Sequence, residues 1–135
     1  MGDEINMGGS ASFMATTETH GVGVIHGFIN GAAYGEMVSE SREVRPGVLE
    51  YEGRHHFLDA DGSSLRTRDV NTVVTGSSEW ANVMHVAYTI DSGTGRFAGY
   101  QGTFHSVGVV LSGKDAFSND SVGTVRFSGT ISRPG

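Results

Sequence analysis

The chain has 135 residues, a net charge of −6 at pH 7, 21 glycines and no cysteine. This length suits one domain with its own core, and the lack of cysteine excludes disulfides, thiolate nucleophiles and cysteine-ligated zinc. The acidic charge and the single lysine, Lys114, argue against nucleic-acid binding and Schiff-base chemistry. No apolar run reaches the ~20 residues of a membrane-spanning helix, and the acidic start lacks signal-peptide features. A cytoplasmic protein without membrane contact is therefore expected.

Strand-like segments follow one another along the chain, and helical periodicity is nearly absent. Residues 1–10 are polar and glycine-rich and are expected to be a flexible N-terminal segment, which leaves residues 11–135 as a single domain. Short turn signals separate most of the eight predicted strands, at 11–19, 22–29, 34–44, 48–58, 64–74, 83–90, 103–111 and 122–132. Trp80 is expected to anchor its loop on the core, with a lid over a barrel mouth as the alternative.

This succession of strands favours an all-β fold, with a barrel and a sandwich as the two leading classes. Few prolines or lysines are present to protect exposed strand edges, so closure is favoured. The expected fold is a small antiparallel closed β-barrel of about eight strands with an internal ligand cavity.

The strands at 48–58 and 64–74 form a hairpin whose register can be predicted. We take Ala60, Asp61 and Gly62 as a three-residue loop with Gly62 in the left-handed conformation. One face then carries the large apolar residues, and the other carries charges of both signs, as a solvent-exposed face would. The pairs on the first face are Leu49–Val73, Tyr51–Asn71, Gly53–Asp69, His55–Thr67 and Phe57–Leu65.

A second hairpin, with Arg45, Pro46 and Gly47 as a three-residue loop, predicts the same inner face. It pairs Arg42 with Glu50 outside, whereas a two-residue loop would place Glu43 beside Glu50, which is electrostatically poorer. The predicted inner pairs are Ser41–Tyr51, Ser39–Gly53 and Met37–His55.

The inner face predicted in this way mixes polar with apolar side chains. An unpaired buried polar group costs about 1–3 kcal/mol, so these groups require mutual hydrogen bonds, water or a ligand. Our hypothesis is a ligand pocket in which His55 and Asp69 move a proton and Tyr51, the third catalytic candidate, holds an oxygen. The expected substrate-binding residues are Asn71, Met37, Phe57, Tyr88, Ser39 and Ser41. The alternative is a set of polar residues that satisfy one another at a solvated mouth.

No metal site is expected. His55 and His56 are adjacent in one strand and point to opposite faces, so they cannot chelate one metal ion together. The remaining histidines lack the spacing of a metal-binding motif and are expected to be ordinary hydrogen-bonded residues, with convergence in space as the alternative. They are His20, His26, His85 and His105.

A glycine cluster, Gly93-Thr94-Gly95-Arg96-Phe97-Ala98-Gly99-Tyr100-Gln101-Gly102, predicts a corner between two strands, with Phe97 as its apolar anchor. This corner resembles the Gly-Thr-Gly-x-Phe-x-Gly…Gly corner of allene oxide cyclase-like and dirigent-like β-barrels. The segment Gly123-Thr124-Val125-Arg126-Phe127-Ser128-Gly129-Thr130-Ile131 is similar to the last strand of that family, and the likeness covers residues 48–132 in pattern.

The resemblance implies an eight-stranded barrel with a ligand cavity, assembled as homodimers or homotrimers and acting without a cofactor. It leads to our functional expectation of a cofactor-independent cyclase or isomerase, or a lyase, acting on a small hydrophobic intermediate of specialised metabolism. A non-catalytic barrel that carries a small molecule is the alternative, and a structural oligomer with a filled core is a third possibility.

Overall fold

The computed structural model describes residues 3–76, 81–111 and 121–134, so Trp80 and Lys114 lie outside the described residues. Within these ranges nearly all regular structure is β-strand, with one short 3-10 helix, Gly95–Phe97. The strands are β1 (Asp3–Asn6), β2 (Gly9–Ala15), β3 (His20–Gly27), β4 (Gly31–Met37), β5 (Arg42–Arg45), β6 (Val48–Asp59), β7 (Ser64–Val74), β8 (Asn82–Gly93), β9 (Gln101–Leu111), β10 (Val122–Ser128) and β11 (Thr130–Arg133).

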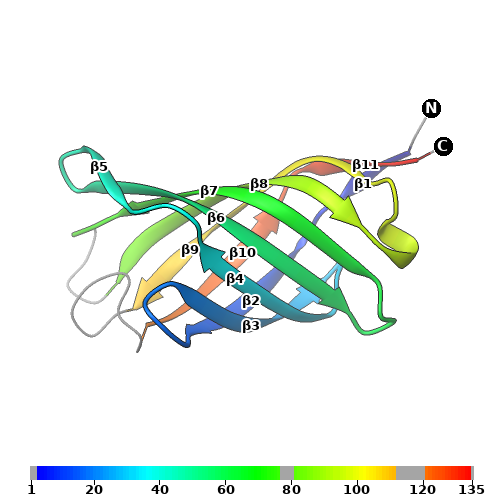
Figure 1. The fold of residues 1–135 in the computed structure, drawn as a ribbon, viewed down its shortest axis with the longest axis horizontal. Helices are drawn as coiled ribbons and strands as arrows, with labels where there is room; N and C mark the ends of the chain where they lie inside the picture. Colours follow the sequence, from blue (N-terminus) through cyan, green and yellow to red (C-terminus); the bar gives the residue numbers. More distant parts are fainter. Residues whose placement is uncertain (1–2, 77–80, 112–120, 135) are drawn as a thin grey trace.

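Eight of these strands close into an antiparallel barrel (Figure 1). Each of β2, β3, β4, β6, β7, β8, β9 and β10 pairs with the next, and β10 pairs back with β2. The predicted closed all-β barrel is thereby confirmed. Closure removes the unpaired edges that a sandwich would leave, which matches the scarcity of edge-protecting residues.

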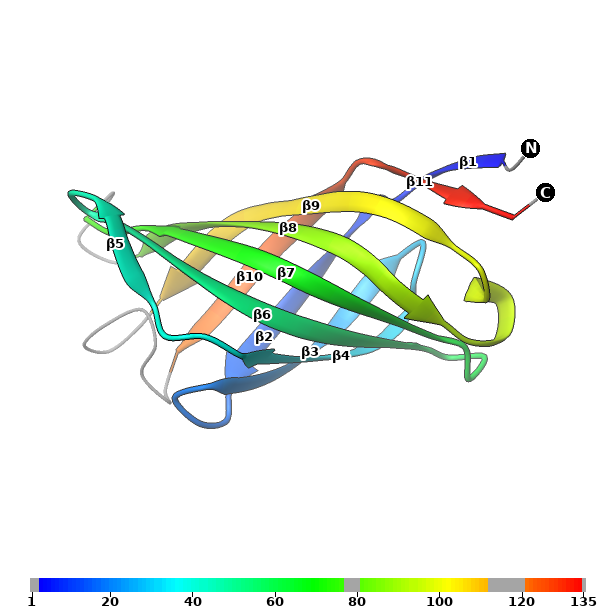
Figure 2. The same ribbon diagram turned by 45° about the horizontal axis from the view of Figure 1, so that its top comes forward.

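Short strands extend the barrel at its two ends. β5 pairs with β6 at one end, while β1 and β11 pair with each other at the other end, where both termini lie (Figures 1 and 2). β11 also pairs with β9, so the predicted strand 122–132 is in fact two strands separated at Gly129, whose φ is +113°.

Within the segment that was expected to be flexible, residues 1–10, the structure has strand β1 and the start of β2. Arg133 donates to the Asp3 carboxylate at 2.7 Å, and Met7 is fully buried. Ile5 also packs against the core. Ile5 and Met7 are two residues apart and so lie on the same face of an extended chain, a strand signal hidden by the polar and glycine-rich surroundings.

The predicted β6–β7 register is confirmed for all five inner pairs. Gly62 has a φ of +92° in the loop that joins the two strands, as that loop type requires. Asp69 is buried, and Arg54 and Arg68 on the opposite face are exposed. The inner face of this hairpin is therefore the one that the sequence predicted.

The second hairpin is confirmed only in part. Arg42 pairs with Glu50, and its guanidinium donates to the carboxylate at 2.7 Å. However, Arg45 pairs with Val48 across a two-residue turn, and a bulge between Glu43 and Arg45 restores the Arg42–Glu50 pair. Residues 38–41 interrupt the predicted strand 34–44, so Met37 pairs with Gly53 instead of His55. This shift of two residues keeps Met37 on the inner face, because side-chain direction repeats every two residues.

The glycine corner between β8 and β9 closes one end of the barrel. Phe97 is fully buried there, and Gly95 and Gly99 have φ values of +60° and +79°, which favour glycine. Arg96 donates to the Phe28 carbonyl at 2.9 Å and to the Asp59 carboxylate at 3.0 Å. The corner is thus tied to the β3–β4 and β6–β7 turns, which leaves the opposite end for a pocket.

Candidate functional site

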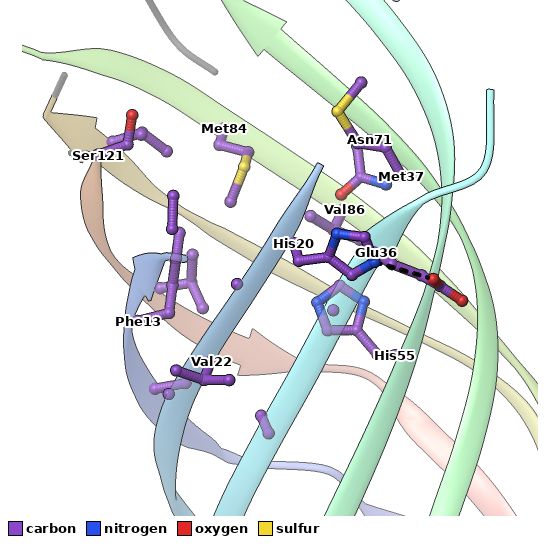
Figure 3. Close-up of a pocket in the computed structure, with 18 of the residues that line it drawn as sticks. Phe13, His20, Val22, Glu36, Met37, His55, Asn71, Met84, Val86 and Ser121 are labelled. Carbon is purple, nitrogen blue, oxygen red and sulfur yellow. Dashed lines mark ion pairs between the residues drawn. The ribbon is translucent and has the colours of Figure 1, made fainter. Parts of the chain in front are cut away.

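A cavity of about 140 Å³ lies inside the barrel, toward the end opposite the glycine corner. Its boundary includes the β2–β3 turn and Ser121, which precedes β10 (Figure 3). The wall is mostly apolar, because the inner positions of the surrounding strands carry aromatic, aliphatic and methionine side chains. These are Ala11, Phe13, Ala33, Met37, Phe57, Val73, Met84, Val86, Tyr88, Val110, Val125 and Phe127.

His55 interrupts this apolar wall on β6, and it is held by Asp69 on β7, which does not itself line the cavity. His55 Nδ1 lies 2.5 Å from one oxygen of Asp69, whose side chain is fully buried. The Thr67 hydroxyl donates to the other Asp69 oxygen at 2.6 Å. Because a carboxylate accepts hydrogen bonds, it favours the His55 tautomer with its proton on Nδ1 and a lone pair on Nε2. The carboxylate therefore orients the imidazole and sets which nitrogen is basic.

Two glycines provide the space for these polar side chains. A Cβ atom added at Gly35 would lie only 2.8 Å from His55 Nε2, so the ring sits directly over the Gly35 backbone. A Cβ atom at Gly53 would lie 3.0 Å from Asn71 Nδ2. Neither glycine has a positive φ, so neither is required by its backbone conformation. Glycine is needed at these positions because it has no side chain that would clash with His55 or Asn71.

Asn71 and Tyr51 face each other across β6 and β7, one inner position from Asp69 toward the mouth. Both line the cavity. Asn71 is buried, and its Nδ2 donates to no partner in the described structure. A buried amide hydrogen without an acceptor costs about 1–3 kcal/mol, so this group is well suited to receive a ligand oxygen.

Tyr51 keeps its phenol proton over a wide pH range. Burial, and then the nearby Asp69 carboxylate, raise the pKa of Tyr51 to about 12. The hydroxyl is therefore a neutral group at physiological pH.

This raised pKa predicts a specific alkaline destabilisation. Unfolding returns Tyr51 to an ordinary pKa near 10, so its contribution to stability is complete below pH 10 and is lost as the pH rises toward about 12. We expect the free energy of unfolding of Tyr51→Phe to fall less steeply than that of the wild type between these values, as measured by urea unfolding at each pH. If the free energy of unfolding falls equally steeply with pH in the two proteins, the raised pKa of Tyr51 is contradicted.

Three further residues that the sequence placed at the site do line the cavity, namely Met37, Phe57 and Tyr88. The Tyr88 hydroxyl is within 2.7 Å of the Ser106 hydroxyl, and burial raises the pKa of Tyr88 strongly. Tyr88 therefore acts as an aromatic wall, and its ring packs edge-on against His55 at 5.2 Å.

Ser39 and Ser41 were wrongly placed at the cavity. Both belong to the interruption between β4 and β5, and neither lines the cavity. The Ser39 hydroxyl instead accepts a hydrogen bond from the Glu52 backbone N–H at 2.8 Å, and Ser41 is exposed. Met37 pairs with Gly53 and Arg42 pairs with Glu50, so the four residues 38–41 lie opposite only two residues of β6. The extra residues cannot continue the ladder, and the two serines therefore leave the inner face.

Sequence reasoning missed several members of the site. Thr67 was identified only as the partner of His55, although its hydroxyl binds the Asp69 carboxylate. Gly35 was missed because its contact with His55 depends on the β4–β6 register. His20, at the start of β3, also borders the cavity, and its Nε2 lies 3.4 Å from the Glu36 carboxylate (Figure 3).

Within residues 3–76, 81–111 and 121–134, no three histidine, aspartate or glutamate side chains form a group that could hold a metal ion. No helix in this part of the chain is long and apolar enough to cross a membrane. No known protein family matches the chain, and neither does any curated protein or solved structure.

Proposed function

We propose that the chain is a cofactor-independent cyclase or isomerase, or a lyase, that acts on a small hydrophobic organic intermediate inside the barrel. The observation that carries this proposal is His55, which lines a largely apolar cavity and is held by the buried Asp69 carboxylate, which in turn binds Thr67. A histidine oriented by a carboxylate is the usual arrangement of a general base. The resemblance of the glycine corner to allene oxide cyclase-like and dirigent-like barrels is consistent with this chemistry.

In the proposed mechanism, His55 Nε2 takes a proton from a carbon atom next to a substrate carbonyl group. The electron pair of the broken C–H bond moves into the carbonyl, which becomes an enolate. Asn71 Nδ2 donates a hydrogen bond to the enolate oxygen, and the Tyr51 hydroxyl helps to orient it. If the enolate is conjugated with a neighbouring C=C bond, it takes the proton back from His55 Nε2 at the far end of that bond, which gives an isomer. If the substrate carries a second, electrophilic double bond, the enolate carbon adds to it and closes a ring; the π electrons of that bond move to its far atom, which takes the proton back from His55 Nε2.

The cavity size limits the substrate. About 140 Å³ is close to the volume that accommodates one benzene ring, and below the ~300 Å³ of typical drug-sized sites. Phe57 and Tyr88 offer aromatic surfaces, and the polar groups Tyr51, His55 and Asn71 lie together on the β6–β7 wall. The substrate class that fits is a single-ring or equally compact carbonyl compound whose oxygen faces that wall. Confinement in such a cavity favours a reactive conformation.

A carrier barrel is the second candidate, because the unpartnered Asn71 amide also suits simple binding. The two functions differ in one respect. A carrier needs the hydrogen-bond donor but not the base.

Exchange of carbon-bound hydrogen for deuterium separates the two functions without knowledge of the natural substrate. Cyclohex-2-enone and a single-ring β-keto lactone are incubated with the protein in D₂O, and deuteration next to the carbonyl is followed by NMR. We expect the wild type to accelerate exchange and His55→Gln, which has a similar length but no basic nitrogen, to give the background rate. Binding is followed separately through the side-chain amide signal of Asn71. Binding without exchange would favour the carrier, and the absence of both would refute both functions.

A further inference from the structure

Phe13 differs in size from its neighbours on one part of the cavity wall. The inner positions of β2 and β3 that line the cavity are Ala11, Phe13, Ala15, Gly21 and Gly23. Among these positions, all of which the structure describes, Phe13 is the only large side chain. The place of its ring therefore decides how much of the space in front of β2 and β3 stays open.

The Phe13 ring lies on the backbone of a glycine. Phe13 pairs with Gly123 on β10 and with Gly23 on β3, so neither neighbouring strand has a side chain beside it. A Cβ atom at Gly123 would overlap the tip of the ring, and would lie only 2.8 and 2.9 Å from Cε1 and Cε2. Gly123 has no positive φ, so its backbone conformation does not require glycine. Glycine is needed there because the ring occupies the place where a side chain would begin.

The Phe13 ring points away from His55. The His55 imidazole lies over Gly35 on β4, and Gly35 pairs with Gly21 on β3. The strand order β10–β2–β3–β4–β6 therefore places the space in front of Gly21 and Gly23 between Phe13 and His55. Figure 3 shows Phe13 and His55 on opposite sides of β3. Because the Phe13 ring lies toward β10, this space beside the imidazole stays open.

We propose that Phe13 determines which substrates reach His55, and that Gly123 holds its ring in the position that admits them. This inference rests on the proposed function of the cavity. With the ring on Gly123, the space in front of Gly21 and Gly23 accepts a single flat ring, in keeping with a cavity of about 140 Å³. A ligand of two fused rings would collide with Phe13. A Phe13 ring turned toward Gly23 would fill this space and keep substrates from the imidazole.

Replacement of Gly123 with Ala tests the proposal, with benzene as the probe. The new Cβ atom must displace the Phe13 ring, and the neighbouring place without a side chain is the one over Gly23. An apolar cavity of this size binds benzene, and such binding involves no proton transfer. We expect the dissociation constant of benzene, measured by NMR titration, to rise about tenfold or more. Nuclear Overhauser contacts of the Phe13 ring should move from residue 123 to Gly23.

Gly8→Ala is the matched control, because the atom nearest to a Cβ at Gly8 would be 4.0 Å away. This variant should bind benzene as the wild type does. A double variant combines Gly123→Ala with Phe13→Ala, which removes the displaced ring, and should regain the benzene binding that Gly123→Ala loses. Phe13→Ala alone should also bind naphthalene, which the wild type should exclude.

The proposal is overturned if the wild type binds no benzene, if Gly123→Ala binds it as tightly as the wild type, or if the double variant binds it as weakly as Gly123→Ala. If Gly123→Ala does not fold, Phe13→Ala decides, because a variant that still excludes naphthalene also overturns the proposal. A wild type that binds benzene but exchanges no deuterium would refute proton transfer by His55 and leave the selection of ligands by Phe13 intact.

Discussion

Replacing Asp69 with Asn is expected to slow proton transfer by His55 about 100-fold or more while the barrel stays folded. Asp69 accepts hydrogen bonds from both His55 and Thr67. One orientation of the new amide would present its NH₂ group to His55 Nδ1 and so impose the wrong tautomer. The other orientation keeps the tautomer but removes the negative charge that stabilises His55 once it has taken up a proton.

The tautomer of His55 can be measured without a substrate. In the wild type, ¹⁵N NMR should show the His55 proton on Nδ1, whereas in Asp69→Asn it should shift at least partly to Nε2. Deuterium exchange into the carbonyl probes reports the rate. Asp91→Asn is a matched control, because Asp91 is an exposed carboxylate on β8, 3.6 Å from Arg68. If Asp69→Asn folds and exchanges deuterium at the wild-type rate, Asp69 does not support His55 as a general base. If the variant unfolds, Asp69 is a structural residue.

Replacing Phe57 with Ala is expected to lower the free energy of unfolding by about 3–5 kcal/mol. Phe57 is 1% exposed and stands at the centre of an aromatic cluster. Its ring centroid lies about 6 Å from those of Tyr88, Phe104 and Phe127. Because three of the surrounding residues are rigid aromatic rings, the space left by Phe57→Ala cannot close easily.

Chemical denaturation measures this loss. Phe57→Leu is the control, and it should lose much less stability because it fills most of the volume. Since Phe57 also lines the cavity, Phe57→Ala should bind larger carbonyl probes than the wild type does. A loss below about 1 kcal/mol would mean that the cluster collapses into the space, and the enlarged cavity would then be absent as well.

Much of the site could be predicted from one hairpin. The three-residue loop at Gly62 and the alternation of apolar residues along β6 and β7 give the pairs Tyr51–Asn71 and Gly53–Asp69, and both occur in the structure. Errors began where a strand was interrupted. Nothing in the composition of residues 38–41 distinguishes a continuous strand from an interruption, so Ser39 and Ser41 were placed on the wrong surface.

The inward faces of β6 and β7 were determined by the sequence alone, because alternation has a period of two and a slip of one residue would expose every apolar side chain on a strand. Some strands are neighbours in the barrel but are not joined by a short turn. The contacts between such strands were decided by the tertiary structure alone. The β4–β6 pairing sets the imidazole of His55 over Gly35, and the folded barrel leaves the Asn71 amide without a partner beside the cavity. These contacts depend on bulges and interruptions, which shift the register without leaving any periodic signal in the sequence.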